Sequence, residues 1–261
     1  MDTLQLVLLS VIQGLTEFLP VSSSAHLVLL SEFLRQEDQG IIFDVGLHFG
    51  TLIAAIVYFR SDIKTMLINL ISEKLSSPGN NLTFNLAVAV FPILIAGFFL
   101  RDSIDLKLRN SEVIAYATIL FGLLLYLAQL NKGKEDVDFL SLPRAFVIGL
   151  FQCLALIPGT SRSGITITAG LFLGLSATAA SRFSFLLAIP TIGAIALVEL
   201  VRFSFLDLSQ NGIELLIAIS ISFLVAYISI DIFLRLIERI GFTPFVIYRL
   251  LLGGWLLLYW T

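Results

Sequence analysis

The chain has 261 residues, of which 57% are hydrophobic and 13% are charged, and its mean hydropathy is +0.97. Soluble domains carry about 25% charged residues, so this composition excludes an ordinary soluble protein. The formal net charge of −3 argues against nucleic acid as a partner. Cys153 is the single cysteine, which excludes an intramolecular disulfide and a cysteine-based metal cluster. We therefore predict one integral membrane domain over residues 1–261, with no soluble domain.

Two apolar helical segments are interrupted by proline. The segment 3–34 is broken at Pro20, and the segment 143–173 is broken at Pro158. Proline lacks a backbone donor and disfavours helix at the residue before it, and each remaining piece is too short to cross about 30 Å of hydrocarbon. We therefore predict two re-entrant helix pairs, because irregular backbone within a membrane must be buried or line a cavity. The expected helical pieces are 3–19, 23–34, 143–157 and 161–173.

Longer apolar runs in the rest of the chain predict full membrane crossings. Each has about the length of mainly apolar sequence that a spanning helix needs. Polar connections are expected at 35–42, Arg60–Asn81, Arg101–Asn110 and Asn131–Asp138. The predicted fold is therefore an all-α polytopic membrane protein with six transmembrane helices and two re-entrant pairs. The six runs are 42–59, 83–100, 112–130, 177–200, 212–234 and 243–260.

The two broken segments also resemble each other weakly. Val11-Ile12 precedes Pro20 as Val147-Ile148 precedes Pro158, although the spacings differ and no strict repeat is present. With the crossings above, the two pairs enter the membrane from opposite faces, which is an inverted repeat. Such an arrangement places a site near the midplane, where the N-termini of half-helices converge.

Basic residues indicate the orientation of the chain, since cytoplasmic loops carry an excess of Lys and Arg. Eight fall on one side of the predicted topology and five on the other, so we expect the first side to be cytoplasmic and both termini external. The first side holds Arg60, Lys64, Lys74, Lys132, Lys134, Arg144, Arg235 and Arg239, and the second holds Arg35, Arg101, Lys107, Arg109 and Arg202.

The first break carries the residue types of an acid–base site. Gln13 and Glu17 are an i, i+4 pair on one helical face, and they could hold a divalent cation or order a water. His26 follows Ser22 by four residues and Ser23 by three, which allows an imidazole to activate a hydroxyl. Two plainer readings remain open: the serines hydrogen bond to backbone carbonyls, or Glu17 forms only an ion pair with the arginine of the second break.

The second break has the pattern of an anion-binding site. The guanidinium of Arg162 can bind phosphate oxygens with two donors, and the free N–H groups of a helix N-terminus favour an anion. Gly159 and Gly164 allow close backbone approach. A snorkelling arginine or a structural ion pair is the alternative, but ionisable residues within membranes are functional by default. The residues expected to bind the anion at the two breaks are Ser22, Ser161, Arg162, Ser163, Gly164 and Thr166.

Other polar residues lack a convergent motif. His48 lies at the start of a predicted span, and we expect a structural role. Asp231, Arg182 and Arg249 are left as pairing or entrance residues.

At the two breaks the sequence resembles the bacterial undecaprenyl-diphosphate phosphatase family, whose members confer bacitracin resistance when abundant. The first family motif reads here as Gln13 to Glu17, then Pro20-Val-Ser22-Ser23 and His26, and the second as Pro158-Gly-Thr-Ser-Arg-Ser-Gly-Ile-Thr166. Further similar phrases, such as Pro244-Phe-Val-Ile-Tyr-Arg249, extend the resemblance over essentially the whole chain. Gln13 stands where many members have glutamate, and an amide is the weaker metal ligand.

The resemblance implies hydrolysis of undecaprenyl diphosphate to undecaprenyl phosphate and inorganic phosphate, which recycles the lipid carrier of peptidoglycan synthesis. It implies Mg²⁺ or Ca²⁺ held by Glu17 and Gln13, and a site in the plasma membrane that opens to the extracytoplasmic side. Family members are often dimeric, and the sequence leaves monomer and homodimer open. The catalytic residues expected are Glu17, Ser23, His26 and Arg162, with Ser23, His26 or water as the nucleophile.

Two other functions remain to be distinguished. Inverted broken helices with polar groups at mid-depth are also typical of secondary transporters, so a transporter or a flippase for a lipid carrier is one alternative. A structural membrane protein whose polar breaks serve only helix packing is the other. Release of phosphate from a prenyl diphosphate separates the enzyme from both.

Overall fold

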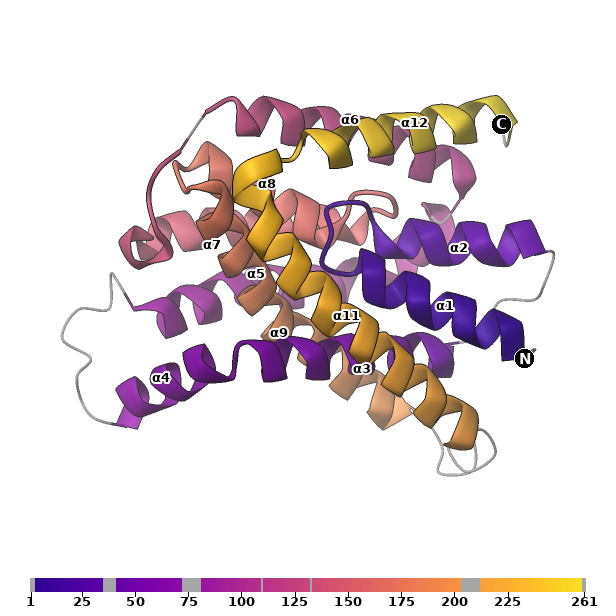
Figure 1. The fold of residues 1–261 in the computed structure, drawn as a ribbon, viewed down its shortest axis with the longest axis horizontal. Coiled ribbons are helices and arrows are strands. Elements are labelled where there is room, and N and C mark those ends of the chain that lie inside the picture. The colour runs from indigo at the N-terminus through magenta and orange to yellow at the C-terminus, as the bar shows by residue number, and fades with distance from the viewer. Residues whose placement is uncertain are drawn as a thin grey trace.

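The computed structural model describes residues 3–34, 41–71, 81–108, 110–131, 133–202 and 212–259. Within these residues the regular structure is helical, apart from an isolated bridge between Glu135 and Leu175 (Figure 1). Arg35, Lys74, Arg109 and Lys132 of the charge comparison lie outside them. The α-helices are α1 (Thr3–Thr16), α2 (Ser23–Leu34), α3 (Ile41–Tyr58), α4 (Arg60–Ile71), α5 (Leu82–Lys107), α6 (Ser111–Gln129), α7 (Leu142–Gln152), α8 (Arg162–Phe172), α9 (Ala177–Arg202), α11 (Gly212–Ile240) and α12 (Thr243–Tyr259), and the short 3₁₀ helices are η2 (Val137–Phe139) and η3 (Cys153–Leu156).

The two predicted helix breaks are confirmed. Helix α1 ends before Pro20 and α2 begins at Ser23, while α7 passes into η3, which ends before Pro158, and α8 begins at Arg162. The proline positions therefore predicted both interruptions correctly. We call the polar stretch of residues 13–26 the first break and that of residues 158–166 the second break.

Several of the long apolar helices have the length and hydropathy of membrane spans, and the chain is a multi-pass membrane protein. Four of the described helices qualify alone: Leu82–Leu100, Ser111–Gln129, Ala177–Val198 and Gly212–Ile240. Phe43–Tyr58 qualifies only together with Arg60–Leu70, from which it is bent by 71°, and Thr243–Tyr259 is a shorter apolar helix. The described part of the chain thus supports four or five spans by these criteria.

The predicted connection at Arg60–Asn81 was wrong in its first half, which forms α4, while residues 72–80 lie outside the described residues. Ile63, Met66, Leu67 and Leu70 recur there at helical spacing, a pattern that the neighbouring charges obscured. Helix α5 likewise continues to Lys107, and α11 continues to Ile240. Loss of hydrophobicity marks where a helix leaves the hydrocarbon, and the helix itself can continue in a polar environment.

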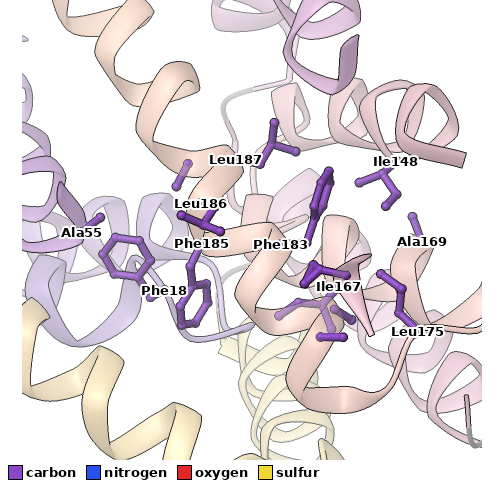
Figure 2. Packing of buried hydrophobic residues seen from close by; sticks show 14 of the residues in the cluster. Phe18, Ala55, Ile148, Ile167, Ala169, Leu175, Phe183, Phe185, Leu186 and Leu187 are labelled. Atoms are coloured by element: carbon purple, nitrogen blue, oxygen red, sulfur yellow. The ribbon is translucent and has the colours of Figure 1, made fainter. Parts of the chain in front are cut away.

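Helix α9 is central to the largest hydrophobic cluster and packs against α3, α5 and α8. Figure 2 shows Phe18, from the first break, beside Phe185 of α9, while Ile167 of α8 lies near Phe183 of the same helix. The rings of Phe18 and Phe185 are 5.1 Å apart in an edge-on arrangement, which stabilises such pairs by about 0.5–1.5 kcal/mol. The first break and α8 are therefore both packed against α9.

Helix α11 crosses α3 and passes beside α1 (Figure 1) at two close contacts. A Cβ atom at Gly50 of α3 would lie 2.0 Å from the Ser222 hydroxyl and 2.5 Å from the Ile219 carbonyl oxygen. A Cβ atom at Gly14 of α1 would lie 2.9 Å from the Ser222 carbonyl oxygen. Small residues of this kind let membrane helices approach closely, so one turn of α11 is packed against both helices.

Replacing Gly50 with alanine is expected to destabilise the protein by about 1–3 kcal/mol, because backbone atoms of α11 must move. The same substitution at Gly97 is the matched control, since a Cβ atom there meets nothing within 4 Å. Gly97→Ala should leave stability unchanged or raise it by up to about 1 kcal/mol through helix propensity. Thermal unfolding in detergent measures both. Equal unfolding temperatures for the two variants would contradict the close packing.

Candidate active site

The two breaks meet through a buried ion pair. Arg162, at the start of α8, places Nη2 2.8 Å from Oε1 of Glu17, directly after α1. Ser163 adds a hydrogen bond of 2.9 Å to the carbonyl oxygen of Leu19. The predicted convergence of the two polar stretches is therefore confirmed, across 145 positions of sequence.

The Glu17 carboxylate accepts hydrogen bonds from residues of three helices. Its Oε2 atom accepts hydrogen bonds from Nε2 of Gln13 at 2.9 Å and from Oγ of Ser23 at 2.8 Å, while Oε1 accepts from Arg162. A buried charge is tolerated when it is paired and its remaining lone pairs are satisfied. A carboxylate has about four acceptor positions, so Glu17 can accept a further partner.

Arg162 is held in position by α9 as well as by Glu17. Its Nη1 donates to the carbonyl oxygen of Ser184 at 3.3 Å, and its guanidinium lies 5.8 Å from the centre of the Phe18 ring. The Ser184 hydroxyl is 2.7 Å from that of Thr166, whose Oγ1 also donates to the Arg162 carbonyl oxygen at 2.9 Å. Ser184 was not predicted as a site residue. In the sequence, Ser184 is distinguished only as a residue with a hydroxyl group within an apolar segment.

Ser22 and Ser161 share an unusual backbone conformation. Among the described residues they are the only non-glycine residues with positive φ, at 73° and 71°. Each immediately precedes a helix, α2 or α8, and Ser161 caps α8 by accepting from the Gly164 N–H at 3.1 Å. Positive φ costs a non-glycine residue about 1–3 kcal/mol. Such strain is concentrated at functional sites. Here the two strained residues set the directions in which α2 and α8 begin, and helix N-termini favour anions.

The structure differs from the predicted pairing of Ser23 with His26. Nδ1 of His26 lies 2.7 Å from the Ser22 carbonyl oxygen, and Nε2 is hydrogen bonded to the hydroxyl of Tyr248. The two rings are stacked with centroids 5.6 Å apart. Ser23 contacts Glu17 instead, because the i, i+4 geometry of α2 directs His26 to a carbonyl group. Tyr248 was missed, since a tyrosine near a helix end more often marks a membrane interface.

His48 lies at the site, although we expected a structural role for it. Its Nε2 is 3.7 Å from Oε2 of Glu17, and its Nδ1 is 2.7 Å from the Asp44 carbonyl oxygen. Because a carbonyl only accepts, Nδ1 carries a proton, and Nε2 is the ring nitrogen nearer to Glu17. The signal that could have found His48 is a titratable side chain inside an apolar helix, the criterion that singled out Arg162.

The other charged residues have separate partners. Asp231 pairs with Arg235 at 3.0 Å and accepts from Tyr58 at 3.3 Å, and Arg182 pairs with Asp62. For these two the pairing alternative is confirmed. Arg249 instead donates to main-chain carbonyl groups of both breaks.

The site has two side chains whose oxygen atoms could be ligands of a cation. Among the described residues no group of three His, Cys, Asp or Glu side chains could hold a metal. The Oε1 atom of Gln13, however, is buried without a hydrogen-bond partner, and Gln13 is bonded to Glu17. Oxygen atoms are the preferred ligands of Mg²⁺ and Ca²⁺, and Mg²⁺ commonly takes one or two protein ligands together with substrate phosphates. Glu17 and Gln13 therefore fit such an ion when a phosphate ligand completes it.

Comparison with known proteins agrees with this geometry. Residues 6–255 match the family model described as bacitracin resistance protein BacA. The chain is 47% identical to undecaprenyl-diphosphatase 1 of Pseudoalteromonas translucida, with both chains covered completely. It is 47% identical to an undecaprenyl-diphosphatase of Hahella chejuensis over 99% of this chain and 98% of that one, and 44% identical to one of Marinobacter nauticus over 97% of each. The chain therefore belongs to the BacA family of bacitracin resistance proteins.

Proposed function

We propose that this chain is an undecaprenyl-diphosphatase, which hydrolyses undecaprenyl diphosphate to undecaprenyl phosphate and inorganic phosphate. The observation that carries the proposal is the pairing of Arg162 with Glu17 at 2.8 Å, with Ser23 on the same carboxylate. It joins an anion-binding arginine, a proton acceptor and a nucleophile within one buried site. The full-length relatives that are named undecaprenyl-diphosphatases support the same activity.

The diphosphate is held at the N-termini of α2 and α8. Arg162 supplies a two-donor guanidinium, and the N-terminus of α8, which contains Gly164, favours an anion through the helix dipole. These donors stabilise the charge that spreads over the phosphoryl oxygens in the transition state. Hydroxyl groups complete the phosphate ligands, which are Ser22, Ser161, Ser163 and Thr166.

Ser23 attacks the terminal phosphorus in this mechanism. Its Oγ forms a bond to phosphorus, the bond to the undecaprenyl phosphate oxygen breaks, and the hydroxyl proton passes to Glu17. Water then cleaves the phosphoserine and releases inorganic phosphate. The hydrogen bond of 2.8 Å between Ser23 and Glu17 supports Glu17 as the proton acceptor. His26 is assigned to orienting the first break, since both of its ring nitrogens already have partners.

Mg²⁺ or Ca²⁺ would be held by Glu17 and Gln13 together with the substrate. When bound, such an ion neutralises charge on the diphosphate and so makes it a better electrophile. Glu17 also orients Ser23, and Gln13 keeps the carboxylate in place through its amide N–H.

For the membrane topology we propose six crossings and two re-entrant pairs in an inverted repeat. The described spans, the bent pair and the shorter apolar helices are compatible with this arrangement. The matching conformations of Ser22 and Ser161, each before a helix, support the equivalence of the two pairs. The excess of basic residues on the opposite side supports a site that opens to the extracytoplasmic face.

The activity is tested by phosphate release from undecaprenyl diphosphate in detergent. We expect the wild type to release phosphate and Glu17→Gln and Arg162→Lys to lose at least about 100-fold in kcat, because proton transfer and two-donor anion binding are lost. Arg235→Gln, which alters an exposed ion pair, should retain activity. No release by the wild type, with binding of the lipid retained, would favour a lipid carrier protein instead.

The nucleophile is tested by rapid acid quench with substrate labelled in the terminal phosphate. We expect a labelled peptide modified at Ser23, and loss of both label and turnover in Ser23→Ala. A label on His26 would contradict this assignment, and turnover without any labelled peptide would indicate direct attack by water.

The metal site is tested by chelation and by changing Gln13. Removal of divalent ions should abolish phosphate release, and Mg²⁺ or Ca²⁺ should restore it. Gln13→Glu adds a charged ligand and is expected to lower the ion concentration for half-maximal activity by about tenfold. Gln13→Ala should raise it. An unchanged requirement in both variants would place the ion elsewhere.

A further inference from the structure

Arg249 of α12 is the largest fully buried side chain among the described residues, with 0% exposure. None of the ion pairs among the described residues includes it. An arginine buried without a carboxylate partner is costly unless its donors are satisfied in another way. The N–H groups of Arg249 must therefore have acceptors other than a carboxylate.

Within the described part of the chain, the hydrogen bonds of the guanidinium all go to main-chain carbonyl groups. Nη1 lies 3.3 Å from the oxygen of Pro20 in the first break, and Nη2 lies 3.0 Å from the oxygen of Gly159 in the second break. Nε donates to the Thr118 oxygen of α6 at 3.1 Å. One planar group thus joins both breaks to α6 and α12.

The two carbonyl groups occupy equivalent positions. Pro20 is two residues before Ser22, and Gly159 is two residues before Ser161. These serines are the two non-glycine residues with positive φ in the described chain. Arg249 therefore ties together the backbone immediately before each strained helix start, and a strained turn persists only where its surroundings hold it.

The adjacent residue contacts the same region. Tyr248 stacks on His26 and hydrogen bonds to its Nε2, while His26 bonds to the Ser22 carbonyl oxygen at 2.7 Å. Consecutive residues of α12 thus reach the first break on both sides of Val21. Helix α12 carries none of the residues assigned above to substrate or metal.

We infer that Arg249 is a positioning residue, which sets the separation of the two breaks so that the N-termini of α2 and α8 bind one diphosphate. The inference rests on the proposed function. A lysine at this position keeps the charge but lacks the planar fork that spans two carbonyl groups. A displacement of about 1 Å in a catalytic site can reduce turnover by about 100-fold.

The first test compares Arg249→Lys with Arg249→Gln at a temperature where both are folded. Both should lose about 100-fold in kcat, with a smaller change in KM, because the phosphate ligands remain. Arg235→Lys and Arg235→Gln are the matched controls on an exposed pair and should retain kcat. Full activity in Arg249→Lys would show that charge alone suffices, and would overturn the positioning role.

A milder variant avoids loss of folding. A Cβ atom at Gly122 of α6 would lie 3.2 Å from Cβ and 3.4 Å from Nε of Arg249, so Gly122→Ala should displace the guanidinium by a few tenths of an ångström. We expect kcat to fall by about tenfold, as a fraction of the loss from a larger displacement. Gly97→Ala is the matched control. An unchanged kcat in Gly122→Ala would contradict the inference.

Hydrogen–deuterium exchange provides a test that does not depend on activity. In Arg249→Lys, amides of residues 17–26 and 158–166 should exchange faster together, while α5 and α9 remain protected. Faster exchange in α6 and α12 alone would indicate a packing role, and faster exchange in one break alone would exclude the link between them. If the wild type releases no phosphate, the proposed function fails, and the exchange result still decides whether Arg249 couples the breaks.

Discussion

The buried pair of Glu17 and Arg162 is the interaction on which the rest of the site depends. Desolvating two charges costs several kcal/mol per ion, and removing one partner of such a pair costs about 3–5 kcal/mol. The pair is favourable here because Gln13 and Ser23 satisfy the carboxylate and Ser184 satisfies part of the guanidinium. Polar groups left without partners in so buried a position would lack water as an alternative partner. In the proposed mechanism the guanidinium of Arg162, which stabilises the resting protein through this pair, also binds the diphosphate.

Backbone strain accompanies this arrangement. Ser22 and Ser161 would be relaxed by glycine, which has no Cβ penalty at positive φ, yet serine supplies a hydroxyl that glycine lacks. The Ser161 hydroxyl caps α8 and lies 3.2 Å from that of Ser163. The backbone strain thus lowers stability, but it allows two hydroxyl groups to lie at the N-terminus of α8. Active sites commonly combine lower stability with function in this way.

Much of this architecture could be predicted from the sequence, because prolines and intramembrane charges are strong local signals. Pro20 and Pro158 marked the breaks, and the charges of Glu17 and Arg162 indicated that the breaks meet. The partner of a particular hydroxyl was not predictable. Ser23 is near His26 in sequence, but the fold brings it to Glu17.

The residues that were missed share a physical reason. His48, Ser184 and Tyr248 lie on helices remote in sequence from the breaks, and each has an adequate structural role when considered alone. Only tertiary packing brings His48 to Glu17 and Ser184 to Arg162. Helix α4 was missed for a simpler reason, since charged residues at its start resembled a loop although its apolar residues recur at helical spacing.

The glycine contacts of α11 restrict how this protein can exchange lipid with the bilayer. Gly14 and Gly50 both pack against the turn around Ser222, with space for hydrogen alone. Rocking one half of the bundle against the other, as transporters do, would pull α1 and α3 away from α11 and open voids between closely packed helices. Exchange of lipid is therefore expected without such rocking, because separating these helices would lose the close packing of α11 against α1 and α3.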